Sequence, residues 1–152
     1  MSESLVNKGL ISRKSISYAL AIKGIASAIT KSHELECLVC ISVFDSSGHQ
    51  VAFARMDGAP FQSIEIAHSK ALSVAGNGMS NHDFWNAIKS EEQITTASSQ
   101  LIGGNWLGGG LPIVLDGELV GALSVSGKSD MAKDIIIATA AVQTIETEFA
   151  KL

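Results

Sequence analysis

Three separated groups of residues in this chain are chemically suited to holding an anion. Residues 55–60 (Arg-Met-Asp-Gly-Ala-Pro) close an apolar run, Lys70 follows in an amphipathic segment, and Gly108, Gly109 and Gly110 stand together further on. A guanidinium can bind a carboxylate or phosphate through two parallel hydrogen bonds, and an ammonium adds a compact positive charge. Consecutive glycines let backbone N–H groups approach a ligand. We predict a small-molecule site where Arg55, Lys70 and the glycines converge.

Each cation also has a purely structural alternative. Arg55 is close in sequence to Asp57 and Asp45 and could simply pair with one of them, and Lys70 could be solvated. Asp57 follows the apolar run directly and precedes a glycine, a position typical of a turn-capping residue rather than of a catalytic acid. We assign Arg55, Asp57 and Lys70 to the ligand site, with Asp57 holding the turn.

The glycine cluster also has a functional and a structural interpretation. It is either an anion cradle of backbone N–H groups or a segment that meets backbone constraints before a strand beginning near Leu111. Pro112 is expected to fix the entry into that strand, because its ring restricts φ. We include Gly108, Gly109, Gly110 and Pro112 among the candidate ligand-binding residues.

Composition limits the class of protein. The chain has 152 residues, 46% of them hydrophobic, and a formal net charge of -4. That is enough apolar material for one compact core, and the absence of a basic run in the sequence argues against nucleic-acid binding. The start carries Glu3 and has no long apolar stretch before Ile11, so we expect no signal peptide, no membrane span and a cytoplasmic location. We divide the chain into an extension, 1–11, and a single domain, 12–152.

Two cysteines have a spacing that elsewhere indicates zinc or redox chemistry. Cys37 and Cys40 lie in an apolar run rich in β-branched residues, where positions three apart point to opposite faces of a strand. Side chains that face apart cannot share a metal ion. We predict buried structural thiols and no metal site.

Hydrophobic periodicity predicts an α+β domain with long helices covering one face of an antiparallel sheet. The strands over 37–45 and 49–56 are predicted to form one hairpin around the turn Ser46-Ser47-Gly48. Asp116-Gly117 is a strong signal for a second hairpin, because both residues tolerate positive φ. In the helix over 63–77, Lys70 is expected to point away from the apolar stripe. The predicted helices are 12–32 (apolar face Tyr18, Ile22, Ile25, Ile29), 63–77, 81–91 and 130–151; the predicted strands are 37–45, 49–56, 111–115 and 118–126; and 95–110 is predicted to be a loop, or a short strand followed by a loop.

The low content of charged residues, 17%, leaves apolar surface that one small domain does not need to expose. We therefore expect a homo-oligomer that buries part of this surface between subunits.

Five short motifs occur in a fixed order along the chain. They are Ile41 to His49, Arg55 to Ala59, Ala67 to Ala71, Gly108 to Ile113 and Gly121 to Gly127. Together they resemble the GlcG/HbpS family over about residues 12–150. The resemblance implies a profilin-like domain with a five-stranded antiparallel sheet flanked by N- and C-terminal helices, and assembly into oligomers. It also implies a small ligand, since some members bind haem and others are fused to corrinoid adenosyltransferases.

If the ligand is haem or another tetrapyrrole, an axial ligand is needed. The histidines are His33, His49, His68 and His82. Some haem-binding relatives use a histidine in the first helix, where this chain has none before His33. His68, two residues before Lys70, is therefore the preferred candidate, and Tyr18 is a second one for which core packing is the alternative.

An enzyme acting on an organic acid is the alternative function. Lys70 would act as a base, Arg55 would bind the carboxylate and the glycines would stabilise an oxyanion or enolate. The sequence contains no G-x-S-x-G, H-E-x-x-H or Walker-type motif, so the common hydrolase and nucleotide-binding classes are not indicated. A binding protein for a small anionic ligand is the first hypothesis and this enzyme is the second.

Overall fold

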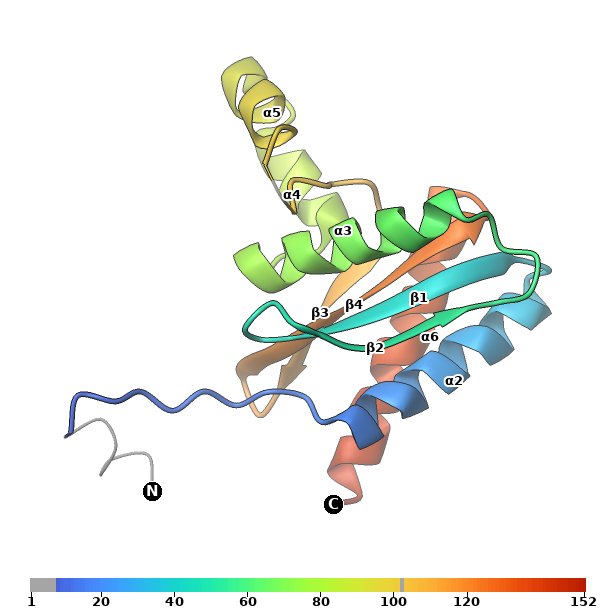
Figure 1. The fold of residues 1–152 in the computed structure, drawn as a ribbon, viewed down its shortest axis with the longest axis horizontal. Helices are drawn as coiled ribbons and strands as arrows, with labels where there is room; N and C mark the ends of the chain where they lie inside the picture. Colours follow the sequence, from blue (N-terminus) through green and yellow to red (C-terminus); the bar gives the residue numbers. More distant parts are fainter. Residues whose placement is uncertain (1–7, 102) are drawn as a thin grey trace.

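A four-stranded antiparallel sheet forms the centre of the molecule. The structure is a computed structural model that describes residues 8–101 and 103–152. The strands are β1 (Leu38–Asp45), β2 (Gln50–Arg55), β3 (Gly110–Leu115) and β4 (Glu118–Lys128), in the order β2-β1-β4-β3 (Figure 1). Both predicted hairpins are confirmed, and Asp116 and Gly117 in the second have positive φ, 50° and 75°. The long pairing of β1 with β4 joins the two hairpins.

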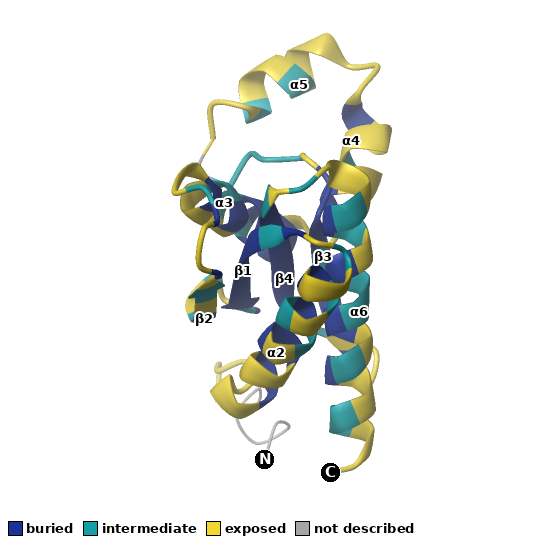
Figure 2. Ribbon diagram, turned by 90° about the vertical axis from the view of Figure 1, so that its right-hand side faces the viewer, coloured by how far each residue is buried: buried dark blue, intermediate teal, exposed yellow. Residues whose placement is uncertain are grey.

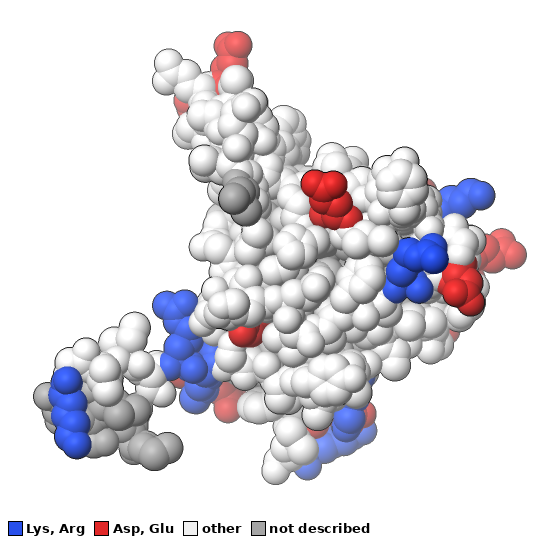
Figure 3. Space-filling view, viewed as in Figure 1, with Lys and Arg blue, Asp and Glu red and all other residues white. Residues whose placement is uncertain are grey.

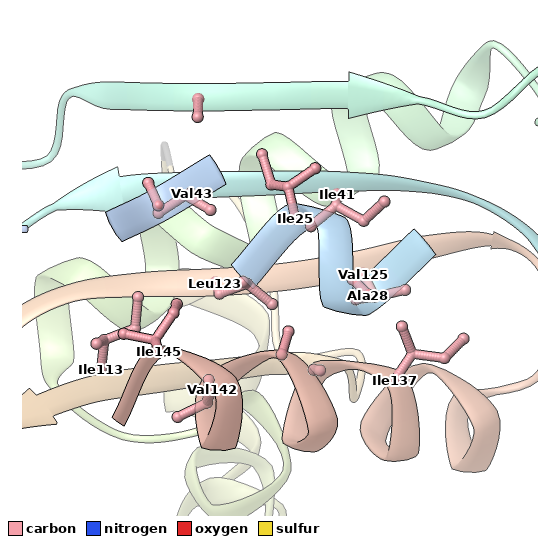
Figure 4. Close-up of a cluster of buried hydrophobic side chains, with 14 of the residues drawn as sticks. Ile25, Ala28, Ile41, Val43, Ile113, Leu123, Val125, Ile137, Val142 and Ile145 are labelled. Carbon is pink, nitrogen blue, oxygen red and sulfur yellow. The ribbon is translucent and has the colours of Figure 1, made fainter. Parts of the chain in front are cut away.

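Helices cover both faces of this sheet. α2 (Tyr18–Glu34) and α6 (Met131–Ala150) pack on one face, as predicted, and α3 (Gln62–Asn77) lies on the other (Figures 1 and 2). The main core therefore lies between the sheet and the α2–α6 layer, where large aliphatic side chains point toward one another (Figure 4). Its members include Ile25, Ala28, Ile41, Val43, Ile113, Leu123, Val125, Ile137, Val142 and Ile145.

The first helix differs from the prediction in both its start and its buried face. α2 begins at Tyr18, because the Ser17 side chain accepts a hydrogen bond from the Leu20 N–H and caps it. Tyr18 is 63% exposed, so the expected packing of Tyr18 in the core is wrong. The buried face instead includes Gly24, where an added Cβ would lie 2.6 Å from Ile145 Cδ1. Close approach to α6 rotates small residues inward and Tyr18 outward.

A short helix occupies the first part of the segment 95–110, which was predicted to be a loop, or a short strand followed by a loop. α4 (Asn81–Ile88) confirms the short helix, but α5 (Glu92–Ser98) was not predicted, and none of its residues is buried. The two helices project from the body of the domain, and Figure 2 shows α5 exposed along most of its length. We call residues 81–101 and 103–107 the arm.

The α+β class is confirmed, but the five-strand count that the resemblance implied is not found. The sheet has four strands within residues 8–101 and 103–152. The segment that could have supplied a short extra strand holds α5 instead. The profilin-like assignment stays a prediction.

The two cysteines lie on opposite faces of the sheet, as predicted. Cys37 packs in the main core beside α2 and α6, whereas Cys40 packs with Ala59 and Ala67 under α3. Both are buried and free. Within the described residues, no helix has the length and apolar character needed to span a membrane.

Candidate functional site

Lys70 is buried in the interior of the protein rather than exposed to a ligand. Its side chain is 2% exposed, and Nζ donates to Gly108 O at 2.8 Å and to Val125 O at 2.9 Å. A third contact joins Nζ to Asp134 Oδ2 at 3.2 Å. An ammonium has three N–H donors, and protein acceptors use all of them. The expectation that Lys70 points away from the buried face of its helix is wrong, because these buried acceptors compensate its charge.

Asp134 is the buried anionic partner of Lys70. It lies near the start of α6, and its Oδ1 accepts a hydrogen bond from Ser129 Oγ. Burial lowers the pKa of the Lys70 ammonium, and the charge of Asp134 acts in the opposite direction. Burial likewise raises the pKa of the Asp134 carboxyl, against the effect of Lys70. Each charge thus depends on the other for its stability in the interior.

The glycines fit tightly around this ion pair. Gly109 has a φ of +123°, and an added Cβ would lie 2.6 Å from Val125 O and 2.9 Å from Asp134 Cβ. An added Cβ on Gly110 would overlap Asn81 Oδ1. The Gly109 carbonyl accepts a hydrogen bond from the Val125 N–H. These contacts favour the structural explanation over an anion cradle for Gly109 and Gly110, whereas Gly108 lines a cleft beside the start of α6.

Pro112 lies inside β3 rather than at its entry. It pairs with Ala122 of β4, on a strand at the edge of the sheet. An edge strand tolerates proline, because the missing N–H can face away from the ladder.

Arg55 does not meet Lys70 or the glycine run within one chain. Arg55 ends β2 and the glycine run leads into β3, and these two strands form opposite edges of the sheet. With neighbouring strands about 4.8 Å apart, the edges are separated by roughly 14 Å. The exposed Arg55 side chain instead donates to Ala59 O at 2.9 Å. The predicted convergence is therefore wrong, and with it the geometric basis for an organic-acid enzyme using Lys70 and Arg55.

Asp57 lies in the turn that follows β2. The turn is closed by a hydrogen bond from the Ala59 N–H to Met56 O at 3.0 Å, and Gly58 has a φ of +84°. Asp57 is exposed at this turn. This position agrees with the prediction that Asp57 is a turn residue.

The two predicted haem ligands lie on different parts of the surface. His68 is exposed on α3, and its ring meets Phe44 edge-on at a centroid distance of 4.8 Å. Tyr18 lies at the start of α2, under the opposite face of the sheet. The structure does not bring His68 and Tyr18 together.

A cleft that the sequence analysis missed lies between the arm and the start of α6. Its volume is about 470 Å³, and apolar side chains of Trp85, Trp106, Leu107 and Met131 line most of it. His82 supplies an imidazole to the same cleft, and its Nε2 lies 3.2 Å from Asn86 Nδ2. We call this the tryptophan cleft. One signal in the sequence was available: His82 and Trp85, three apart on a helix, share a face, and the chain's other tryptophan precedes the glycine run.

A larger groove has a different chemical character. It measures about 560 Å³, lies between α2 and α6, and is lined mainly by hydroxyl, amide and charged side chains. It offers no aromatic, histidine or methionine side chain. The tryptophan cleft is therefore a better candidate than this groove for a largely apolar ligand that needs aromatic contacts and an imidazole.

Lys and Arg are scattered among acidic residues on the face seen in Figure 3, rather than gathered into one basic patch.

Comparison with known proteins gives a consistent result. The family described as haem degrading protein, HbpS-like, matches residues 16–143. An uncharacterized 15.0 kDa protein from the dhaT-dhaS intergenic region of Citrobacter freundii is 32% identical over 113 residues, 70% of this chain and 77% of that protein. The corrinoid adenosyltransferase PduO of the same organism is 30% identical over 120 residues, 78% of this chain but 36% of PduO. The chain thus spans about a third of PduO.

A solved structure shares the fold. It is a PduOC:haem complex with a TM-score of 0.78 and 24% identity, covering 86% of this chain and 94% of that one.

Proposed function

The chain belongs to the HbpS-like family, and on that premise we propose that it is a small binding protein for haem or another tetrapyrrole. The family description names haem degradation, and a structure of the same fold was solved as a haem complex. Both supports concern relatives. The feature of this chain that carries the proposal is the tryptophan cleft.

The side chains of the cleft fit the chemistry of a tetrapyrrole. A macrocycle needs an apolar slot, and a haem iron needs an axial ligand such as histidine or methionine. Trp85, Trp106 and Leu107 offer apolar contact surface, and His82 and Met131 offer the two kinds of ligand atom. A volume of about 470 Å³ is within the range of small-molecule sites. When bound, the haem iron would supply redox and ligand-exchange chemistry, and this chain would position it and limit its contact with water.

The first test is a haem titration of the wild type and of His82→Ala. We expect a Soret shift on binding to the wild type, and for His82→Ala an altered spectrum with affinity lower by about tenfold or more, which corresponds to about 1.4 kcal/mol. Metal-free protoporphyrin should bind both proteins similarly, because it does not use the imidazole as an iron ligand.

His68→Ala and Tyr18→Phe are the matched controls, since both residues are exposed and lie outside the cleft. They are expected to leave the titration unchanged. Loss of the Soret shift in His68→Ala, with His82→Ala behaving as wild type, would instead support the ligand predicted from the sequence. A wild type that does not bind haem would end the proposal.

We also propose that identical copies of the chain associate through the arm. Ile94 and Leu101 are apolar and are 48% and 66% exposed there. A seven-residue helix gains little stability on its own, so packing against another chain would stabilise α5. A second copy with the same low surface charge is the occupant that this apolar surface favours. Light scattering after size-exclusion chromatography should give a mass above the 15.9 kDa of one chain.

The double variant Ile94→Lys/Leu101→Lys is expected to shift that mass toward one chain. Leu10→Lys is the control, because Leu10 is also exposed and belongs to the segment before α2, which lies far from the arm (Figure 1). A wild type that is monomeric at micromolar concentration, or equal effects of the two changes, would contradict association through the arm.

A further inference from the structure

The walls of the tryptophan cleft come from three segments that are separate in sequence. α4 carries His82 and Trp85, the loop before β3 carries Trp106 and Leu107, and the first turn of α6 carries Met131. These side chains are exposed or only partly buried, so they do not hold one another in place. Buried residues beneath the cleft must therefore set the distances between its walls.

A buried polar cluster of Lys70, Asn81 and Asp134 reaches all three walls. Lys70 Nζ donates to Gly108 O, next to Leu107, and pairs with Asp134, which lies about one helical turn after Met131. This ion pair joins the loop wall to the α6 wall. The two side chains are 2% and 7% exposed, so their contacts are shielded from competing water.

Asn81 joins the remaining wall, α4, to the loop wall and to Lys70. It is the first residue of α4, directly before His82, and the residue is 1% exposed. Its Nδ2 donates to Asn105 O at 2.6 Å and to the main-chain Lys70 O at 3.3 Å. The Asn81 side chain fits against Gly110, where a Cβ would overlap its Oδ1 atom. The α4 wall is thereby tied both to the loop and to α3.

We propose that Lys70, Asn81 and Asp134 are positioning residues that hold the three walls of the tryptophan cleft in register for its ligand. They act on the cleft through main-chain atoms and neighbouring residues rather than by contact with the ligand. Directional hydrogen bonds in a buried setting define one arrangement, whereas apolar replacements of similar volume would allow several. The consequence for haem affinity depends on the proposed function, but the consequence for the shape of the cleft does not.

The chain provides a built-in probe for this idea. It has two tryptophans, and both line the cleft, so the intrinsic tryptophan fluorescence reports on the cleft alone. In Asn81→Leu, which removes the amide donor at similar volume, we expect a red-shifted emission and stronger quenching by acrylamide while circular dichroism stays that of the wild type. Haem affinity is expected to fall about 10- to 100-fold, as for supporting residues around metal ligands.

Ser32→Ala is the matched control. Ser32 is also fully buried and donates a hydrogen bond, to Ala28 O at 2.7 Å, but it lies in α2 on the opposite face of the sheet. It should lower stability without changing the fluorescence or the haem affinity. If Asn81→Leu only lowers stability, as Ser32→Ala does, positioning by Asn81 is wrong.

Two further outcomes can be separated. If the wild type does not bind haem, the proposed function fails, and the quenching experiment still decides whether the cluster shapes the cleft. Should Asn81→Leu not fold, Asn81→Ala tests the same bonds with less steric risk. Unchanged quenching in that variant would overturn the inference.

Discussion

Lys70→Met is expected to lower the free energy of unfolding by about 3–5 kcal/mol, the usual cost of removing one partner from a buried ion pair. The variant would leave the Asp134 carboxylate buried without its cation, and would also remove the donor to Gly108 O and Val125 O. Methionine fills a similar volume, so the loss reflects charge and hydrogen bonding more than a cavity. Urea unfolding followed by circular dichroism measures it.

Lys23→Met provides the comparison on the surface. Lys23 pairs with Glu148 at 3.0 Å, but the Lys23 side chain is 52% exposed. Water and salt screen such a pair, so the change should cost less than about 1 kcal/mol. Adding Asp134→Asn completes a double-mutant cycle, in which the two losses should not be additive. A loss in Lys70→Met no greater than in Lys23→Met would show that the buried pair is not important for stability.

Gly109→Ala is expected to lower the free energy of unfolding by about 3 kcal/mol, combining backbone strain with steric overlap. Gly109 has a φ of +123°, which an alanine adopts only at a cost. The new methyl would also lie 2.6 Å from Val125 O, on the central strand β4, which cannot move without disturbing the sheet. Thermal and urea unfolding of the purified variant would measure the change.

Gly117→Ala separates the two causes. Gly117 also has a positive φ, +75°, but an added Cβ there would meet no atom within 4 Å. Its cost should be limited to backbone strain, about 1 kcal/mol. Equal losses at Gly109 and Gly117 would mean that packing around the Lys70–Asp134 pair does not require the glycine.

Local patterns predicted the parts of the fold that depend on near neighbours in sequence. The hairpin at Asp116-Gly117 follows from two residues that accept positive φ, and the helix over 130–151 follows from its repeating apolar positions. The five ordered motifs also predicted the family, and this is confirmed by the match over residues 16–143. These features needed no knowledge of what packs against them.

Features that depend on distant partners were the ones predicted wrongly or missed. Tyr18 fits an apolar stripe, but close packing of Gly24 against Ile145 turns it outward. α5 was missed because it is only seven residues long, and its two apolar residues, Ile94 and Ala97, are too few to show a helical period. The tryptophan cleft was missed for a related reason, since its walls come from three segments that meet only in the folded chain.

Composition, periodicity and the order of the motifs were enough to predict the α+β class, the two hairpins, the opposite facing of Cys37 and Cys40, and the family. The positions of Arg55, Lys70 and the glycines relative to one another depended on which residues meet in the folded chain. A lysine is buried or solvated according to whether an acceptor reaches it, and Asp134 lies 64 positions away in the chain. The strand order places β2 and β3 at opposite edges of the sheet, and for this reason Arg55 lies apart from the glycine run.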